Sequence, residues 1–246
     1  MNPRPLLFSS ILILLSSCSL FLKSSKPYQP EMVHIQGGSF ILGDVIEERN
    51  TDALPVHEVT IGSFYLSRYE ITFEKYDQFA ESKGLTLPDD GGYGRGDRAV
   101  VNITWDEALA FCKSLGYRLP SEIEWEYAAR SAGKKQLYAG TNNVDSLKHY
   151  AITRDSNINF SFRVGSRLPN DIGLYDMSGN VFEWVDEFYQ FYSMPDQLHN
   201  HKTDGIRIIR GGSFGELTST TRTYWRTGTL HDVRASDLGF RCAKSK

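Results

Sequence analysis

Cysteine is scarce in this chain of 246 residues, which has three, at positions 18, 112 and 242. Small exported domains that depend on disulfide bonds carry more, so the scarcity excludes a disulfide scaffold and favours a body with its own apolar core. For Cys112 and Cys242 we predict two buried free thiols. A single disulfide is the alternative, because an exported protein meets an oxidising environment.

Long apolar runs and an excess of one charge are also lacking. The run from Leu6 to Leu15 is too short to cross a membrane. The formal net charge is −3, with acids and bases interspersed, which argues against a nucleic-acid partner. No internal repeat or low-complexity tract is found, and 21 glycines indicate a globular body with many turns.

The N-terminus has the pattern of a bacterial lipoprotein. Arg4 precedes the apolar run, and Leu15-Ser-Ser-Cys18 resembles a lipobox, a motif that implies cleavage before Cys18 and lipid on that residue. We predict a signal peptide over residues 1–17, a tether over residues 18–30 and one folded domain over residues 31–246, anchored at the outer membrane or cell surface. The alternative is an ordinary signal peptide with an incidental cysteine.

Three helices have clear start signals. Thr72 caps the helical pattern of residues 73–83, and capping boxes begin at Thr104 and at Ser121. Helices early in the chain and irregular strands late indicate an α+β fold. Alternating apolar residues around Gly37 and Gly38 predict two short strands and a turn within residues 32–44, and alternation recurs over residues 56–65. Residues 206–209, 223–227 and 238–243 are also predicted as short strands.

Ordered blocks along the chain carry a resemblance to a known family. The principal blocks are GYRLPSEIEWEYAARSAG (116–133), VGSRLPNDIGLYDMSGNVFEWVDEFY (164–189), RIIRGGSF (207–214) and DLGFRCAK (237–244). They resemble the formylglycine-generating enzyme, or sulfatase-modifying factor, family. The resemblance covers about residues 32–244 and implies a C-type lectin fold with little regular secondary structure.

The family's oxidising enzymes carry two cysteines shortly after the RGGS block, where they bind copper and the substrate thiol. The matching positions fall near Glu216 and Thr221, and neither is cysteine. The reaction needs a thiolate as soft copper ligand and nucleophile, which carboxylate and hydroxyl groups cannot replace. We therefore predict that this chain keeps the scaffold and has lost that reaction.

Other members of the family use a non-haem iron held by histidines that lie largely on a separate helical domain. His199 and His201 are the only close pair here, and no acidic third ligand stands at a recognised spacing. A solvated loop is the favoured interpretation of this pair, and a shared metal is the alternative.

One metal expectation follows from the resemblance. In family enzymes the stretch that matches GLYDMSGNVFEW binds a structural calcium, and the matching positions are Asp176, Gly179, Val181 and Glu183. Calcium prefers hard oxygens from a bent loop that contains glycine, so the residue types suit it. The alternative is that Asp176 and Glu183 cap turns and pair with nearby arginines. No other cofactor is expected.

The tract that begins at Arg210 is the candidate binding site. Gly211 and Gly212 permit a tight turn or a close backbone approach. The residues beyond them mix hydroxyls, aromatics and charges, as binding loops do. If Tyr224 and Trp225 are strand neighbours, one points inward and one outward. The predicted ligand contacts are Glu216, Leu217, Thr218, Ser219, Tyr224, Trp225, Thr227, Thr229, Leu230, His231 and Asp232.

The chain also resembles the variable proteins of diversity-generating retroelements, which are lipoproteins with this scaffold and no catalytic cysteines. That resemblance implies that the C-terminal segment is rewritten at adenine positions, which gives one backbone many binding specificities. A fold whose anchors lie outside its site accepts such changes, because most surface substitutions cost little stability.

The sequence thus predicts a lipid-anchored surface protein that binds a protein or glycan ligand through its C-terminal loops and catalyses nothing. The first alternative is a divergent metal-dependent enzyme of the same family with an oxidative or modifying activity. The second is an envelope protein that only scaffolds a complex. A shallow exposed patch of Tyr224, Leu230 and His231 would favour the binding protein.

Overall fold

The computed structural model describes residues 28–192 and 205–246 of the chain. The predicted signal peptide, the lipid-bearing Cys18, most of the tether and the pair His199 and His201 lie outside the described residues. Within them, no helix is both long enough and apolar enough to cross a membrane.

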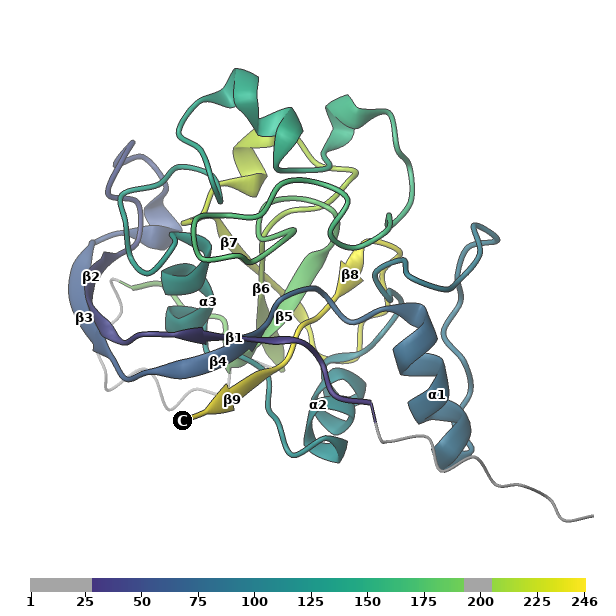
Figure 1. Ribbon diagram of the computed structural model, residues 1–246. Helices are drawn as coiled ribbons and strands as arrows, with labels where there is room; N and C mark the ends of the chain where they lie inside the picture. The colour runs from purple at the N-terminus through teal and green to yellow at the C-terminus, as the bar shows by residue number, and fades with distance from the viewer. Residues whose placement is uncertain (1–27, 193–204) are drawn as a thin grey trace, which may run out of the picture.

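Two small sheets join the N-terminal strands to the end of the chain (Figure 1). In the first, β4 (Phe64–Ser67) lies between β1 (Met32–Ile35) and β9 (Ala243–Ser245), and both pairings are antiparallel. In the second, β2 (Gly38–Leu42) pairs with β3 (His57–Ile61). The two strands predicted within residues 32–44 therefore exist, but they pair with later strands and not with each other.

A third sheet has the strand order β7-β6-β5-β8. It contains β5 (Phe182–Phe188), β6 (Ile206–Arg210), β7 (Arg226–Leu230) and β8 (Leu238–Gly239), and β5 runs parallel only to β8. The strand predicted over residues 223–227 begins later than expected, at Arg226. The central strand β5 was not predicted, because its first four residues are all buried and show no alternation.

The three predicted helices begin where their caps place them. In α1 (Phe73–Lys83) the Thr72 hydroxyl accepts from the backbone of the first turn, and a left-handed Gly84 ends the helix. Complete capping boxes start α2 (Trp105–Ser114) and α3 (Glu122–Ala129). These local predictions are confirmed, because a cap needs only residues within one helical turn.

Apolar side chains form two main clusters on either side of the central sheet's strands. One joins α1 and α2 to the C-terminal segment, with Phe111, Trp184 and Phe240 closed to solvent. The other packs Trp125 and Ala128 of α3 against β2, β4 and β6. Figure 1 places α2 at the bottom of the molecule and the loops of residues 144–156 and 218–221 at the top.

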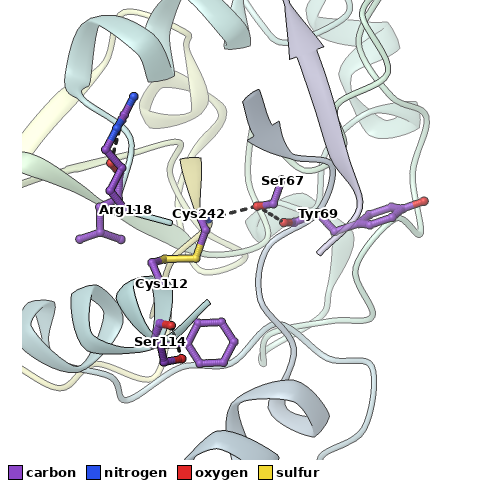
Figure 2. Close-up of a disulfide and its surroundings, with 8 residues drawn as sticks. Ser67, Tyr69, Cys112, Ser114, Arg118 and Cys242 are labelled. Carbon is purple, nitrogen blue, oxygen red and sulfur yellow. Dashed lines mark hydrogen bonds between the residues drawn. A yellow bond between two sulfur atoms is a disulfide. The ribbon is translucent and has the colours of Figure 1, made fainter. Parts of the chain in front are cut away.

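Cys112 and Cys242 form a disulfide, so the prediction of two free thiols is wrong (Figure 2). Their Cα atoms lie 5.6 Å apart although 130 residues separate them in sequence. Both cysteines are buried, as predicted. The proximity arises because α2 packs against the last segment of the chain, where the backbone N–H of Cys242 donates to the Ser67 hydroxyl at 3.1 Å.

Candidate functional site

A buried ion network lies beneath the C-terminal tract. Arg226 on β7 donates to both carboxylate oxygens of Glu122, at 2.6 and 2.9 Å. Arg210 on β6 lies 2.5 Å from one oxygen of Glu126, and Arg130 lies 2.9 Å from the other. All five side chains are buried, and removing one partner of such a pair costs about 3 to 5 kcal/mol because the other charge stays buried. The network therefore holds β6 and β7 against α3.

Tyr224 belongs to this base and not to a binding surface. Arg210 donates to the backbone carbonyls of Thr223 and Tyr224 at 2.9 and 3.1 Å, in a turn outside the ladder of β6. The Tyr224 side chain is 1% exposed, and its hydroxyl donates to Glu47. Burial and this hydrogen bond raise the pKa of Tyr224. The prediction of Tyr224 as a ligand contact is therefore wrong, and the exposed patch of Tyr224, Leu230 and His231 that would have favoured a binding protein is not formed.

Trp225 is half-buried and lines a hollow of about 280 Å³ together with residues of the 47–51 loop. One aromatic of the pair was expected to point inward and the other outward, and the structure buries Tyr224 while Trp225 is half-buried. The cause is a turn and not strand alternation, since β7 begins only at Arg226.

The predicted glycine turn is confirmed at the end of β6. Gly211 and Gly212 have φ angles of +94° and +71°, which side chains other than glycine rarely adopt. A Cβ on Gly212 would lie 2.9 Å from the carbonyl oxygen of Thr220, so the tract folds back closely over this turn. The Gly211 carbonyl also accepts from the Gly179 backbone at 2.8 Å.

Beyond this turn, η5 (Thr218–Thr221) borders a cavity of about 720 Å³. The cavity's other walls are η2 (Val144–His149), η3 (Arg154–Ser156) and the loop at Arg167. Arg154 ties η3 to the tract, because its backbone N–H donates to the Glu216 carbonyl at 3.0 Å and its Nε donates to that of Gly215 at 2.9 Å. Of the predicted contacts, Thr218 lines the cavity, while Leu217 is 53% exposed beside it.

Five ionisable side chains line this cavity, and no hydrogen bond or ion pair joins any of them to another side chain of residues 28–192 and 205–246. They are Asp145, Lys148, His149, Asp155 and Arg167. The Nε of Arg167 is also closed to solvent without an acceptor. A buried donor without an acceptor costs about 1 to 3 kcal/mol, so the site is incomplete as a purely structural arrangement.

The sequence reasoning missed these five residues. They lie at least 50 positions before Thr218 in a stretch without helical or strand periodicity, so only the folded chain brings them to the tract. Such a cluster cannot be recognised from the sequence, because tertiary contacts decide which charged side chains are paired.

Ser219 lies in η5 beside Thr218, and the predicted contacts after Trp225 lie along β7 and just past its end. There the His231 carbonyl accepts from the Trp105 backbone, and His231 Nδ1 lies 2.9 Å from Asp106, both at the start of α2. Five strand residues span roughly 13 Å at about 3.3 Å per step, so the predicted contacts form two separate surfaces. This second surface comprises Thr227, Thr229, Leu230, His231 and Asp232, and Leu230 is 46% exposed.

The expected calcium position holds a buried cluster of three carboxyl groups and one guanidinium. Arg241 donates to both oxygens of Glu183 at 2.7 Å, which is the arginine pairing given above as the alternative. Burial raises the pKa of Asp176 to about 6 and the pKa of Glu70 well above its ordinary range. Asp176 Oδ2 accepts from the Gly165 backbone at 2.7 Å, while its Oδ1 has no partner among the described residues.

The unpaired oxygen of Asp176 and the excess of carboxyl groups over arginine fit a cation. No three acidic, histidine or cysteine side chains of the described residues converge as a metal-binding group. The resemblance implies Asp176, Glu183 and the main-chain carbonyls of Gly179 and Val181 as ligands, and of these Glu183 is already paired with Arg241. Calcium remains a proposal, with stiffening of this loop as its effect.

The positions that match the family's catalytic cysteines carry no thiol. Glu216 is half-buried, and Thr221 is buried, with its hydroxyl donating to the Thr218 carbonyl at 2.9 Å. Because Cys112 and Cys242 are bonded to each other, the described part of the chain contains no free thiol.

Comparisons with known proteins agree on one family. Residues 19–246 match the sulfatase-modifying factor enzyme 1-like domain. The chain is 31% identical over 248 residues to the serine/threonine-protein kinase pkn1 of Chlamydia pneumoniae, covering 89% of this chain and 39% of that protein. It thus spans about two fifths of the length of the chlamydial kinases that it matches.

Two mouse proteins match over most of their length. The chain is 26% identical over 277 residues to the formylglycine-generating enzyme of Mus musculus, covering 87% of this chain and 74% of that protein. It is 27% identical over 294 residues to the inactive C-alpha-formylglycine-generating enzyme 2 of Mus musculus, covering 96% and 92%. Active and inactive proteins therefore share this domain.

Two solved structures are similar over nearly the whole described chain. Treponema denticola variable protein 1 superimposes with a TM-score of 0.71 at 25% identity, covering 87% of this chain and 95% of that one. PvdO from Pseudomonas aeruginosa does so with a TM-score of 0.70 at 28% identity, covering 88% and 95%. The predicted irregular α+β architecture is confirmed. The chain belongs to the family of the sulfatase-modifying factor enzyme 1-like domain, built on a C-type lectin fold.

Proposed function

We propose that the chain is a ligand-binding member of its family, without catalytic activity, and that its binding site is the cavity between η2, η3 and η5. One observation carries the proposal: Thr218 of the C-terminal tract meets five unpaired ionisable side chains around about 720 Å³ of open space. Small-molecule sites occupy about 300 to 1,000 Å³ and place a few polar groups toward the ligand.

The chemistry at the tract supports binding over catalysis. Glu216 and Thr221 replace the two thiols on which the family's copper-dependent oxidation depends. The similar proteins include an inactive formylglycine-generating enzyme and a variable protein, so the scaffold also exists in forms with other roles.

The lipobox at Leu15–Cys18 supports a place for this site at the cell envelope. We propose that Cys18 carries lipid and that the domain projects from the outer membrane or cell surface by its tether. Labelling cells with a radioactive fatty acid tests this directly. Label on the wild-type chain and none on a Cys18→Ala variant is the expected result, and equal label on both would contradict it.

The binding site is tested with the full chain on glycan and protein arrays. Thr218→Trp places a large side chain at the cavity wall and should abolish binding of every ligand that the wild-type chain retains. Leu230→Ser changes the other predicted surface, at the far end of β7, and serves as the matched control. Loss of binding with Leu230→Ser and not with Thr218→Trp, at unchanged melting temperatures, would move the site to that surface.

We also propose that the tract varies among cells, as the likeness to a variable protein suggests. Deep sequencing of the end of the gene across a population tests it. Substitutions clustered at codons 216 to 237 and mostly at adenines are the expected result. An invariant segment would leave a binding protein of fixed specificity.

A further inference from the structure

Arg167 is the cavity residue whose bonding is least complete. Its Nε is buried without an acceptor, as are the Nε atoms of several other arginines. Those others are held through their remaining nitrogens, as Arg222 is by Glu47 and Arg210 by Glu126. No hydrogen bond or ion pair joins Arg167 to the described residues. Its positive charge acts on the buried Asp176, where it partly offsets the rise in pKa that burial causes. The two Nη atoms of Arg167 are neither buried nor bonded to a described residue and are therefore available to a ligand in the cavity.

The charges around Arg167 limit what that ligand can be. Lys148 and Arg167 are balanced by Asp145 and Asp155, so the cavity has no net charge when His149 is neutral. A balanced site does not concentrate polyanions, which excludes sulfated polymers and nucleic acids as preferred ligands. It accepts one anionic group at the arginine and hydrogen-bond donors at the two carboxylates.

Hydroxyl groups of the protein line the same cavity as these charges. Thr153, Ser156 and Thr218 line the cavity. Ser156 Oγ accepts from the Thr153 backbone at 3.2 Å, which leaves its own proton free for a ligand oxygen. Hydroxyls both donate and accept, so this lining matches a ligand that carries several hydroxyls.

We infer that the cavity binds an acidic sugar, with the carboxylate of a hexuronic acid on the guanidinium of Arg167 and its hydroxyls on Asp145, Asp155 and Thr218. Arginine recognises a planar carboxylate through two parallel N–H bonds, which a single ammonium cannot reproduce. Carboxylates of the protein accept from sugar hydroxyls and repel a second anionic group, so one acidic residue is selected over a densely charged chain. This inference rests on the proposed function, and it gives the ligand a chemical class.

Calorimetry with the full chain tests the inference, with glucuronic and galacturonic acid as probes. Glucose and galactose lack the carboxylate, and glycine carries a carboxylate with an ammonium group in place of hydroxyls. We expect at least one uronic acid to bind at least tenfold more tightly than its neutral hexose and than glycine. Arg167→Gln should reduce this affinity at least tenfold, and Arg167→Lys should give an intermediate loss.

Arg163→Gln is the matched control, because Arg163 is an exposed arginine of the same loop that pairs with Asp97. It should change the affinity less than twofold, and the melting temperatures should show that all variants fold. Equal binding of the neutral hexose, an unchanged affinity in Arg167→Gln, or tighter binding of glycine would each overturn the inference. So would the absence of binding by every probe. In that case, array binding that Thr218→Trp abolishes would still support the proposed function, and array binding that Thr218→Trp leaves intact would overturn both.

Discussion

At the scale of single residues, the fold keeps several carboxyl groups away from water, and their titration is measurable. Burial, followed by the charge of Glu122, raises the pKa of Glu187 from 4.5 to about 7. Because the folded pKa lies above the unfolded value, the contribution of Glu187 to stability is fully present below about pH 4.5 and is lost as the pH rises to about 7.

Glu187→Gln removes this titration. Since the side chain is half-buried, we expect the free energy of unfolding to rise by about 1 kcal/mol at pH 8 and to change little at pH 4.5. Urea unfolding at both pH values measures it. Glu81→Gln, on the exposed face of α1, is the control and should show the same small effect at both. An equal effect of Glu187→Gln at both pH values would mean that the carboxyl is not titrating between them.

Asp176 offers a residue-scale test of calcium. Its Oδ1 is buried without a partner, so calcium that binds the native state should raise the melting temperature by mass action. We expect a rise of a few degrees when calcium replaces a chelator, and no rise in Asp176→Asn. Asparagine suits the left-handed backbone at φ +58° and still accepts from Gly165. A wild-type melting temperature that ignores calcium would refute the proposal.

At the scale of elements, the wall of the cavity depends on one close backbone contact. A Cβ on Gly179 would lie 2.2 Å from the carbonyl oxygen of Ile152, just before η3, and Gly179 has φ +81°. Gly92 has a similar φ of +77° with nothing within 4 Å of the added atom. The pair therefore separates the cost of the backbone conformation from the cost of the clash.

We expect Gly92→Ala to cost about 1 kcal/mol of unfolding free energy, which is the strain of a left-handed residue. Gly179→Ala should cost about 3 kcal/mol, since the Ile152 carbonyl must also move. Because Ile152 leads into η3, Gly179→Ala should also weaken ligand binding at the cavity, while Gly92→Ala should leave binding unchanged. Similar losses of stability in the two variants would show that the backbone at Ile152 can move at little cost and that the predicted clash is relieved.

Helices and strands that are determined by neighbouring residues were predictable from the sequence. Those that depend on residues far away in the sequence were not. The caps at Thr72, Thr104 and Ser121 act within one turn, and each helix begins where its cap predicts. Strand β5 escaped prediction because its first four residues are all buried and show no alternation, and one of them is the charged Glu183. Only the folded chain brings Arg241, 58 positions away, to neutralise that charge.

The same distinction between local and long-range contacts applies to the candidate site. The turn at Gly211 and Gly212 was predictable from the sequence, because glycine adopts the positive φ angles that such a turn requires. Tyr224 is of a residue type that is common in binding sites. In the structure its side chain is buried, and its hydroxyl donates to Glu47, which lies 177 positions earlier in the sequence. Arg167 and the residues of η2 lie at least 50 positions before Thr218 and meet it only in the folded chain. The resemblance to a family supplied the scaffold but not these side chains.

At the scale of the whole molecule, the two ends of the domain are held together twice. Strands β1 and β9 lie on either side of β4, and the Cys112–Cys242 disulfide joins α2 to the segment just before β9. A disulfide that spans 130 residues restricts the unfolded chain strongly and is worth about 2 to 5 kcal/mol. The loops of residues 144–156 and 218–221, which contribute most of the cavity's lining, lie at the top of the molecule, and α2 lies at the bottom (Figure 1).

This separation predicts that stability and binding respond differently to loss of the disulfide. The double variant Cys112→Ser, Cys242→Ser should lose about 2 to 5 kcal/mol of unfolding free energy, and a reductant should destabilise the wild-type chain equally. The reductant should not change the stability of the double variant. This control excludes effects of the reductant other than cleavage of the disulfide. Well below the melting temperature, ligand affinity should stay within twofold of wild type, because the cavity is lined by η2, η3, η5 and the loop at Arg167 and by no residue of α2 or of the C-terminal segment. Affinity that falls with the disulfide at such temperatures would mean that α2 and the C-terminal segment shape the cavity from across the sheets.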